Sequence, residues 1–134
     1  MTIENNKQVV TEFFARFSAG NLAGALELLG DDATWWIAGE LEGGFAAGEH
    51  TKEQIAQLLR GMGRQLANGL RMTVHGLVAE GEKVAAEVSS YGELRNGKIY
   101  RNQYHFVLTV RGGRITAVRE YLDTKHVEAT WART

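Results

Sequence analysis

The stretch IYRNQYHFVLTVRGGRITAVREYL, residues 99–122, decides the fold class. Two runs rich in β-branched and aromatic residues flank the turn Gly112-Gly113, which predicts an antiparallel hairpin. Just upstream, Asn96-Gly97 is a strong hairpin signal, because a type I′ turn needs positive φ at both central residues. With a third turn at Glu80-Gly81-Glu82, these signals predict a four-stranded antiparallel meander, with strands near 70–79, 83–92, 99–110 and 114–122.

The first half of the chain has helical periodicity instead. Apolar residues on one side of a helical wheel predict a helix over about 3–18, ended by Ala19-Gly20. A short second helix is expected to begin after its cap at Asn21 and to end with Gly30 in a left-handed conformation. Three further elements are predicted: a strand at 33–37, a glycine-rich loop or irregular hairpin at 38–50, and a helix that opens with a capping box at 51–54.

This order of elements predicts an α+β domain in which helices cover one face of a curved sheet. The chain of 134 residues fits a single domain, residues 1–134. Cysteine is absent, which excludes disulfides, thiolate metal sites and a cysteine nucleophile. The four histidines have no metal-ligand spacing, so no metal and no other cofactor is expected.

Composition also restricts the partners. Fifteen Lys and Arg against sixteen Asp and Glu give a net charge of -1, which argues against nucleic-acid binding. No apolar run approaches the roughly 20 residues of a membrane span. Because the N-terminus lacks an apolar stretch of the signal-peptide type, we expect a cytoplasmic protein.

The strand near 99–110 has two faces of unequal polarity. Its side chains alternate between a more apolar face, with Tyr104, Phe106 and Leu108, and a second face, with Gln103, His105 and Val107. If the more apolar face were buried, His105 would be exposed to solvent, yet Val107 gives the second face apolar character too. We therefore expect helices on one side of the sheet and a second copy of the chain on the other, with the more apolar face in the interface.

Glu120 is a carboxylate flanked by apolar neighbours in the last predicted strand. Counted outward from the Gly112-Gly113 turn, positions 105 and 120 lie roughly opposite, and neighbours on one face of a sheet are about 5 Å apart. A carboxylate and an imidazole at that distance can serve as base and acid for one bound molecule. We predict that Glu120 and His105 form such a pair.

Two stretches carry a family resemblance: VVTEFFARFSAGNLAGALELLGDDATWW at 9–36 and NQYHFVLTVRGGRITAVREYLDT at 102–124. They resemble the SnoaL-like group of the nuclear transport factor two-like superfamily, which includes ketosteroid isomerases, polyketide cyclases and limonene epoxide hydrolases. The resemblance covers about residues 7–126. It implies a cystatin-like α+β roll, in which a curved, mainly antiparallel sheet wraps around the N-terminal helices and encloses a conical cavity. It also implies homodimers formed through the outer sheet face.

This sequence has only some of the catalytic groups that the resembling families use. The oxyanion-binding tyrosine of ketosteroid isomerases aligns with Phe13, their proton-shuttling acid with Ile37, and their second donor with His105. Steroid isomerisation of that kind is therefore not expected. The water-activating carboxylate of limonene epoxide hydrolases aligns with Glu120 and their acid with His105. Their water-holding tyrosine and asparagine align with Trp35 and Ile37.

Three functions stay open at this point. The first is an enzyme, of isomerase, cyclase or epoxide-hydrolase type, that acts on a small apolar molecule with Glu120 and His105 as its acid–base pair. The second is a domain that binds a ligand without reaction, and the third is a dimeric assembly domain. For the first two, the predicted ligand-binding residues are Phe13, Phe14, Trp35, Ile37, Gln103 and Val118. Residues 127–134 are expected to dock on the domain or on a partner through Trp131.

Overall fold

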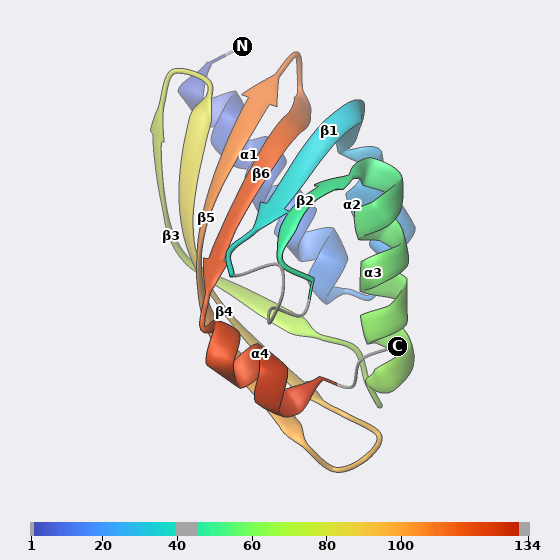
Figure 1. Cartoon of the computed structure of the whole chain (residues 1–134). Helices are drawn as coiled ribbons and strands as arrows, with labels where there is room; N and C mark the ends of the chain where they lie inside the picture. The colour runs from blue at the N-terminus through green and yellow to red at the C-terminus, as the bar shows by residue number, and fades with distance from the viewer. Residues whose placement is uncertain (1, 40–45, 132–134) are drawn as a thin grey trace.

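A computed structural model describes residues 2–39 and 46–131 of the chain. Figure 1 shows the elements within these residues, four helices and six strands. In chain order they are α1 (Ile3–Ser18), α2 (Leu22–Glu27), β1 (Leu29–Ile37), β2 (Gly48–Thr51), α3 (Lys52–Gln65), β3 (Arg71–Glu80), β4 (Lys83–Glu93), β5 (Ile99–Arg111), β6 (Arg114–Leu122) and α4 (Thr124–Thr130).

The strands form one curved sheet in the order β2-β1-β6-β5-β4-β3. All neighbours are antiparallel except β1 and β6, which run parallel. As Figure 1 shows, α1 crosses one face of the sheet and α3 stands beside β1 and β2. Helix α4 lies at the end of the sheet where β5 begins. The expected α+β architecture, with a curved sheet around the N-terminal helices, is confirmed.

Local signals set most helix boundaries. Thr51 accepts a hydrogen bond from the Gln54 backbone at 3.1 Å, and the Gln54 side chain accepts one from the Thr51 backbone at 2.9 Å, so the capping box at the start of α3 is confirmed. The left-handed position expected for Gly30 is wrong. Leu29 already pairs with Ile115 of β6, which draws Gly30 into β1 rather than into a helix cap.

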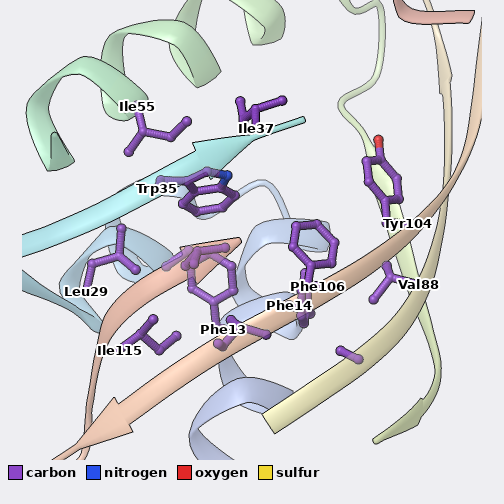
Figure 2. Packing of buried hydrophobic residues seen from close by; sticks show 14 of the residues in the cluster. Phe13, Phe14, Leu29, Trp35, Ile37, Ile55, Val88, Tyr104, Phe106 and Ile115 are labelled. Atoms are coloured by element: carbon purple, nitrogen blue, oxygen red, sulfur yellow. The ribbon is translucent and has the colours of Figure 1, made fainter. Parts of the chain in front are cut away.

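The core lies between the helices and the inner face of the sheet. Figure 2 shows four aromatic rings at its centre, those of Phe13, Phe14, Trp35 and Phe106, with ring centroids 5.1–6.3 Å apart in neighbouring pairs. Phe106 is 1% exposed and Leu108 fully buried. The expectation that Tyr104, Phe106 and Leu108 form a dimer face is therefore wrong, because these side chains point inward.

The C-terminal segment closes one end of the domain. Asp123 caps α4 by accepting a hydrogen bond from the His126 backbone at 3.2 Å. The His126 ring stacks on Tyr100, and Trp131 packs edge-on against the same ring at a centroid distance of 4.9 Å. Trp131 is thus docked on the domain, whereas 132–134 and the glycine-rich 40–45 lie outside the described residues.

Within the described part of the chain, no helix is both long and apolar enough to span a membrane.

Candidate active site

An apolar pocket opens among the core residues, between α1, α3, α4 and the inner face of the sheet. It offers about 60 Å³ to the centre of a water-sized sphere. One water needs roughly 10–15 Å³ on this measure, so the pocket has room for several waters or one compact molecule. Most of its wall is aliphatic and aromatic, with Phe13, Phe14, Trp35 and Ile37 among the lining side chains. These four predicted ligand-binding residues do lie at the pocket.

Glu120 brings a carboxyl group into this apolar wall. Its backbone pairs with Phe106 on β5 and with Ile37 on β1, so its side chain shares their inward-facing side of the sheet. The indole N–H of Trp35 donates a hydrogen bond to Glu120 Oε1 at 2.9 Å. Among the pocket-lining residues that the structure describes, Glu120 is the sole carboxyl group.

Burial raises the pKa of Glu120 from its ordinary value of 4.5 to about 7. The cause is desolvation, because the charged form loses water in an apolar wall, and the hydrogen bond from Trp35 opposes the rise only in part. A carboxyl group with this pKa exchanges its proton near neutral pH, which is the property that a general base or acid requires.

The predicted pairing of His105 with Glu120 is wrong. His105 lies opposite Tyr121 on the outer face of the sheet and is exposed, whereas Glu120 lies opposite Phe106 on the inner face. The two side chains therefore point to opposite sides of the sheet. Gln103 shares the outer face with His105 and does not reach the pocket, and Val118 is buried in the core without lining it.

A β-bulge next to the hairpin turn causes this error. Near the turn, Val110 pairs with Ile115, but the next residue, Thr109, pairs with Ala117, so Thr116 is an extra residue in β6. The added residue shifts the register by one, and a shift of one position exchanges the two faces of a strand.

The inner face instead brings two tyrosines to the pocket, Tyr100 and Tyr104, which the sequence-based site did not include. Their hydroxyl oxygens are 2.8 Å apart. Burial raises the pKa of Tyr100 to about 12 and that of Tyr104 well above its ordinary value of 10, and the carboxyl of Glu120 adds to both shifts. The sequence does contain a signal for these tyrosines. Side chains alternate between the two faces of a strand, so residues 100 and 104 lie on the same face of β5 as Phe106.

The pocket therefore combines a carboxyl group that can take a proton with hydroxyl groups that stay protonated and can donate hydrogen bonds. Among residues 2–39 and 46–131, no group of three or more His, Asp or Glu side chains is placed to hold a metal ion. The polar side chains of the described wall are thus those of Glu120, the two tyrosines and Thr124, together with the indole groups of Trp35 and Trp131.

The chain is thus an α+β domain whose curved sheet and helices enclose an apolar pocket with one half-buried glutamate in its wall. The chain belongs to the SnoaL-like domain family, whose model matches residues 10–118. The family resemblance inferred from the sequence is confirmed. No protein among those with curated functions matches the chain.

Solved structures share the fold along nearly the whole chain. A nuclear transport factor two-like protein from Burkholderia xenovorans is 27% identical, with a TM-score of 0.75 over 97% of this chain and 98% of that chain. A putative isomerase from Bacillus subtilis is 23% identical, with a TM-score of 0.78 over 97% and 95%. The protein TerC, crystallised with polyporic acid, is 17% identical, with a TM-score of 0.80 over 94% and 97%.

Proposed function

We propose that this protein is an enzyme that removes a proton from a compact, mostly apolar molecule bound in the pocket, with Glu120 as the general base. The observation that carries the proposal is the position of Glu120, the sole carboxyl group in the described part of a mostly apolar wall, with a pKa of about 7. Perturbed carboxyl groups in clefts are characteristic of catalytic sites. His105 has no part in this proposal, because it lies on the other face of the sheet.

Proton abstraction from carbon suits this pocket better than activation of water does. The Trp35 indole holds one oxygen of Glu120, and the tyrosine hydroxyls of the pocket are already hydrogen-bonded to each other, to Ser90 and to Asn102, so few groups are free to hold a water against the carboxylate. An apolar substrate can instead place a C–H bond against it directly. The reaction class is therefore that of an isomerase or cyclase, and the putative isomerase of Bacillus subtilis with the same fold supports it.

Glu120→Gln is expected to slow proton exchange by at least about 100-fold, the usual contribution of a positioned general base. The protein would be incubated in D2O with compact cyclic ketones, lactones and nitroalkanes, and deuterium uptake followed by mass spectrometry. The rate in the unmodified protein should rise with pH through about 7 and then level off, because the base acts only when deprotonated.

Glu87→Gln is the matched control, since Glu87 lies opposite His105 on the outer face and is exposed. It should leave the exchange rate within about twofold of the unmodified protein. Equal rates in the Glu120 and Glu87 variants would contradict the proposal. So would the absence of exchange above the buffer rate for every compound, which would favour a binding domain without reaction.

We also propose that two copies of the chain associate through the outer sheet face. The observation in favour is an exposed aromatic cluster there: Tyr121 is 40% exposed, and Trp36 and Arg119 lie against it, with the Arg119 guanidinium 4.1 Å from the Trp36 ring centroid. Aromatic side chains with arginine are enriched in protein interfaces.

A further inference from the structure

A second apolar hollow lies beside the pocket, where the ends of α1 and α3 approach each other. Its lining comes from α1, the turn to α2, the second half of α3 and the segment before β3: Phe17, Gly20, Leu22, Leu59, Met62, Gly63, Leu66, Gly69 and Leu70. Among these described residues, none has a polar or charged side chain. On the measure used for the pocket, this α1–α3 groove offers about 250 Å³.

The α1–α3 groove continues the pocket. Four side chains line both hollows and so form the partition between them: Phe17, Leu59, Met62 and Leu70. All but Leu70 are half-buried. Met62 is unbranched and has three rotatable bonds, so it adapts its shape more readily than a branched side chain does. A partition of this kind can yield to a molecule that extends from one hollow into the other.

Gly63 leaves space in the α1–α3 groove on the side of α3. Positions 59, 62, 63 and 66 share one face at the helical period, and the other three are leucine or methionine. The period therefore predicts a large apolar side chain at position 63. A Cβ atom added at Gly63 would meet nothing within 4 Å, and the backbone there does not have a positive φ. Neither a close contact nor the backbone conformation requires glycine at this position.

Gly92 shows the contrast with a glycine that packing does require. A Cβ atom at Gly92 would lie 2.9 Å from the side chains of Leu66 and Leu70, so glycine is needed for these two leucines to pack. Glycine inside a helix is destabilising relative to alanine or leucine, because it restricts the unfolded chain least. The protein is thus less stable for having Gly63, and what it has in return is the open volume of the groove.

We propose that the α1–α3 groove binds the unbranched alkyl tail of a substrate whose compact reacting head lies in the pocket. This inference rests on the proposed function and deepens it, because it adds a tail to the compact substrate. The lining offers no hydrogen-bonding side chain to a polar tail, which favours a hydrocarbon. Since four residues are shared between the two hollows, head and tail belong to one molecule.

The test measures the binding of phenol, 4-propylphenol and 4-hexylphenol by isothermal titration calorimetry. The head is the same in all three probes, so its contribution cancels when their affinities are compared. Affinity should rise about threefold to fourfold with each methylene that enters the groove, the usual gain for a buried CH₂ group. Gly63→Leu fills the groove and should reduce the gain from phenol to 4-hexylphenol by at least about tenfold, the effect of excluding two methylenes, while phenol affinity changes by less than about twofold.

Gly61→Leu is the matched control for this variant. Gly61 lies in the same helix but lines neither hollow, and a Cβ atom there would meet only Arg64 Nη2, at an ordinary contact distance of 3.7 Å. Both variants replace a helical glycine by a better helix former, so both should fold and melt no lower than the unmodified protein. Gly61→Leu should keep the full gain with chain length.

Equal gains with chain length in the Gly63→Leu and Gly61→Leu proteins would overturn the proposal. So would an unmodified protein whose affinity does not rise from phenol to 4-hexylphenol. A lower mass of Gly63→Leu than of Gly61→Leu in light scattering without probe would assign the groove to a second copy of the chain instead. These measurements are independent of turnover. If Glu120 is not the base, deuterium exchange fails while the gain with chain length and its loss in Gly63→Leu remain.

Discussion

Glu120→Gln is expected to stabilise the folded protein by up to roughly 3 kcal/mol above pH 7, and to raise its melting temperature by several degrees. The raised pKa of Glu120, about 7 against 4.5, means that burial penalises the charged carboxylate. Each pKa unit corresponds to about 1.4 kcal/mol. Glutamine carries no charge and can still accept the hydrogen bond from Trp35, so the variant avoids the penalty. Catalytic sites commonly trade stability for function in this way.

The pH dependence gives this prediction its sign. Between pH 4.5 and 7 the folded protein holds the Glu120 proton more tightly than the unfolded chain does. Stability is therefore greatest below pH 4.5 with respect to this group, and is lost as pH rises through about 7. Thermal melts of both proteins from pH 4 to 9 should diverge over this window and coincide at its acid end.

His105→Gln provides the control for an ion pair between the two residues. Because His105 and Glu120 lie on opposite faces, the two substitutions should be additive in the free energy of unfolding. A buried ion pair would instead lose about 3–5 kcal/mol when either partner is removed. A lower melting temperature for Glu120→Gln across the whole pH range would refute the stabilisation.

Most of the fold could be predicted from the sequence because its signals are local. The helical period of residues 3–18, the capping box at Thr51 and the glycine turns each depend on residues close together in the chain. Parallel pairing of β1 with β6 joins segments about 80 residues apart, and no local pattern specifies it. This pairing also explains why Gly30 entered a strand.

The candidate site could be predicted only in part, because the sequence does not show how β5 and β6 pair residue by residue. Glu120 is predicted because its neighbours on one face of the strand are apolar, and Trp35 because the family resemblance aligns it with a water-holding tyrosine. Which residues face Glu120 depends on the extra residue Thr116, and the sequence around it has no distinctive bulge signal. Because of this one added residue, the carboxyl group faces the aromatic side chains of β5 and not His105.

Phe106→Asp is expected to unfold the protein, whereas Tyr121→Asp should leave it folded and separate the proposed dimer. Phe106 is 1% exposed and contacts the rings of Phe14, Trp35 and Tyr104. Even Phe106→Ala should cost about 3–5 kcal/mol, a large part of the stability of a domain this size. An unpaired charge in the same place costs more, so folded Phe106→Asp should not accumulate.

Tyr121 is an aromatic residue of β6, the strand next to β5, and its side chain points to the outer face. Tyr121→Asp is therefore the matched comparison for Phe106→Asp. A carboxylate there is hydrated in the monomer, so the circular dichroism spectrum and the melting temperature of the monomer should change little. In a dimer through this face the two charges would be buried near Trp36 and Arg119, and the association should weaken. Light scattering should then give about twice 14.8 kDa for the unmodified protein and 14.8 kDa for Tyr121→Asp. A monomeric unmodified protein at micromolar concentration would rule out the interface, and a folded Phe106→Asp protein would contradict the inward orientation of β5.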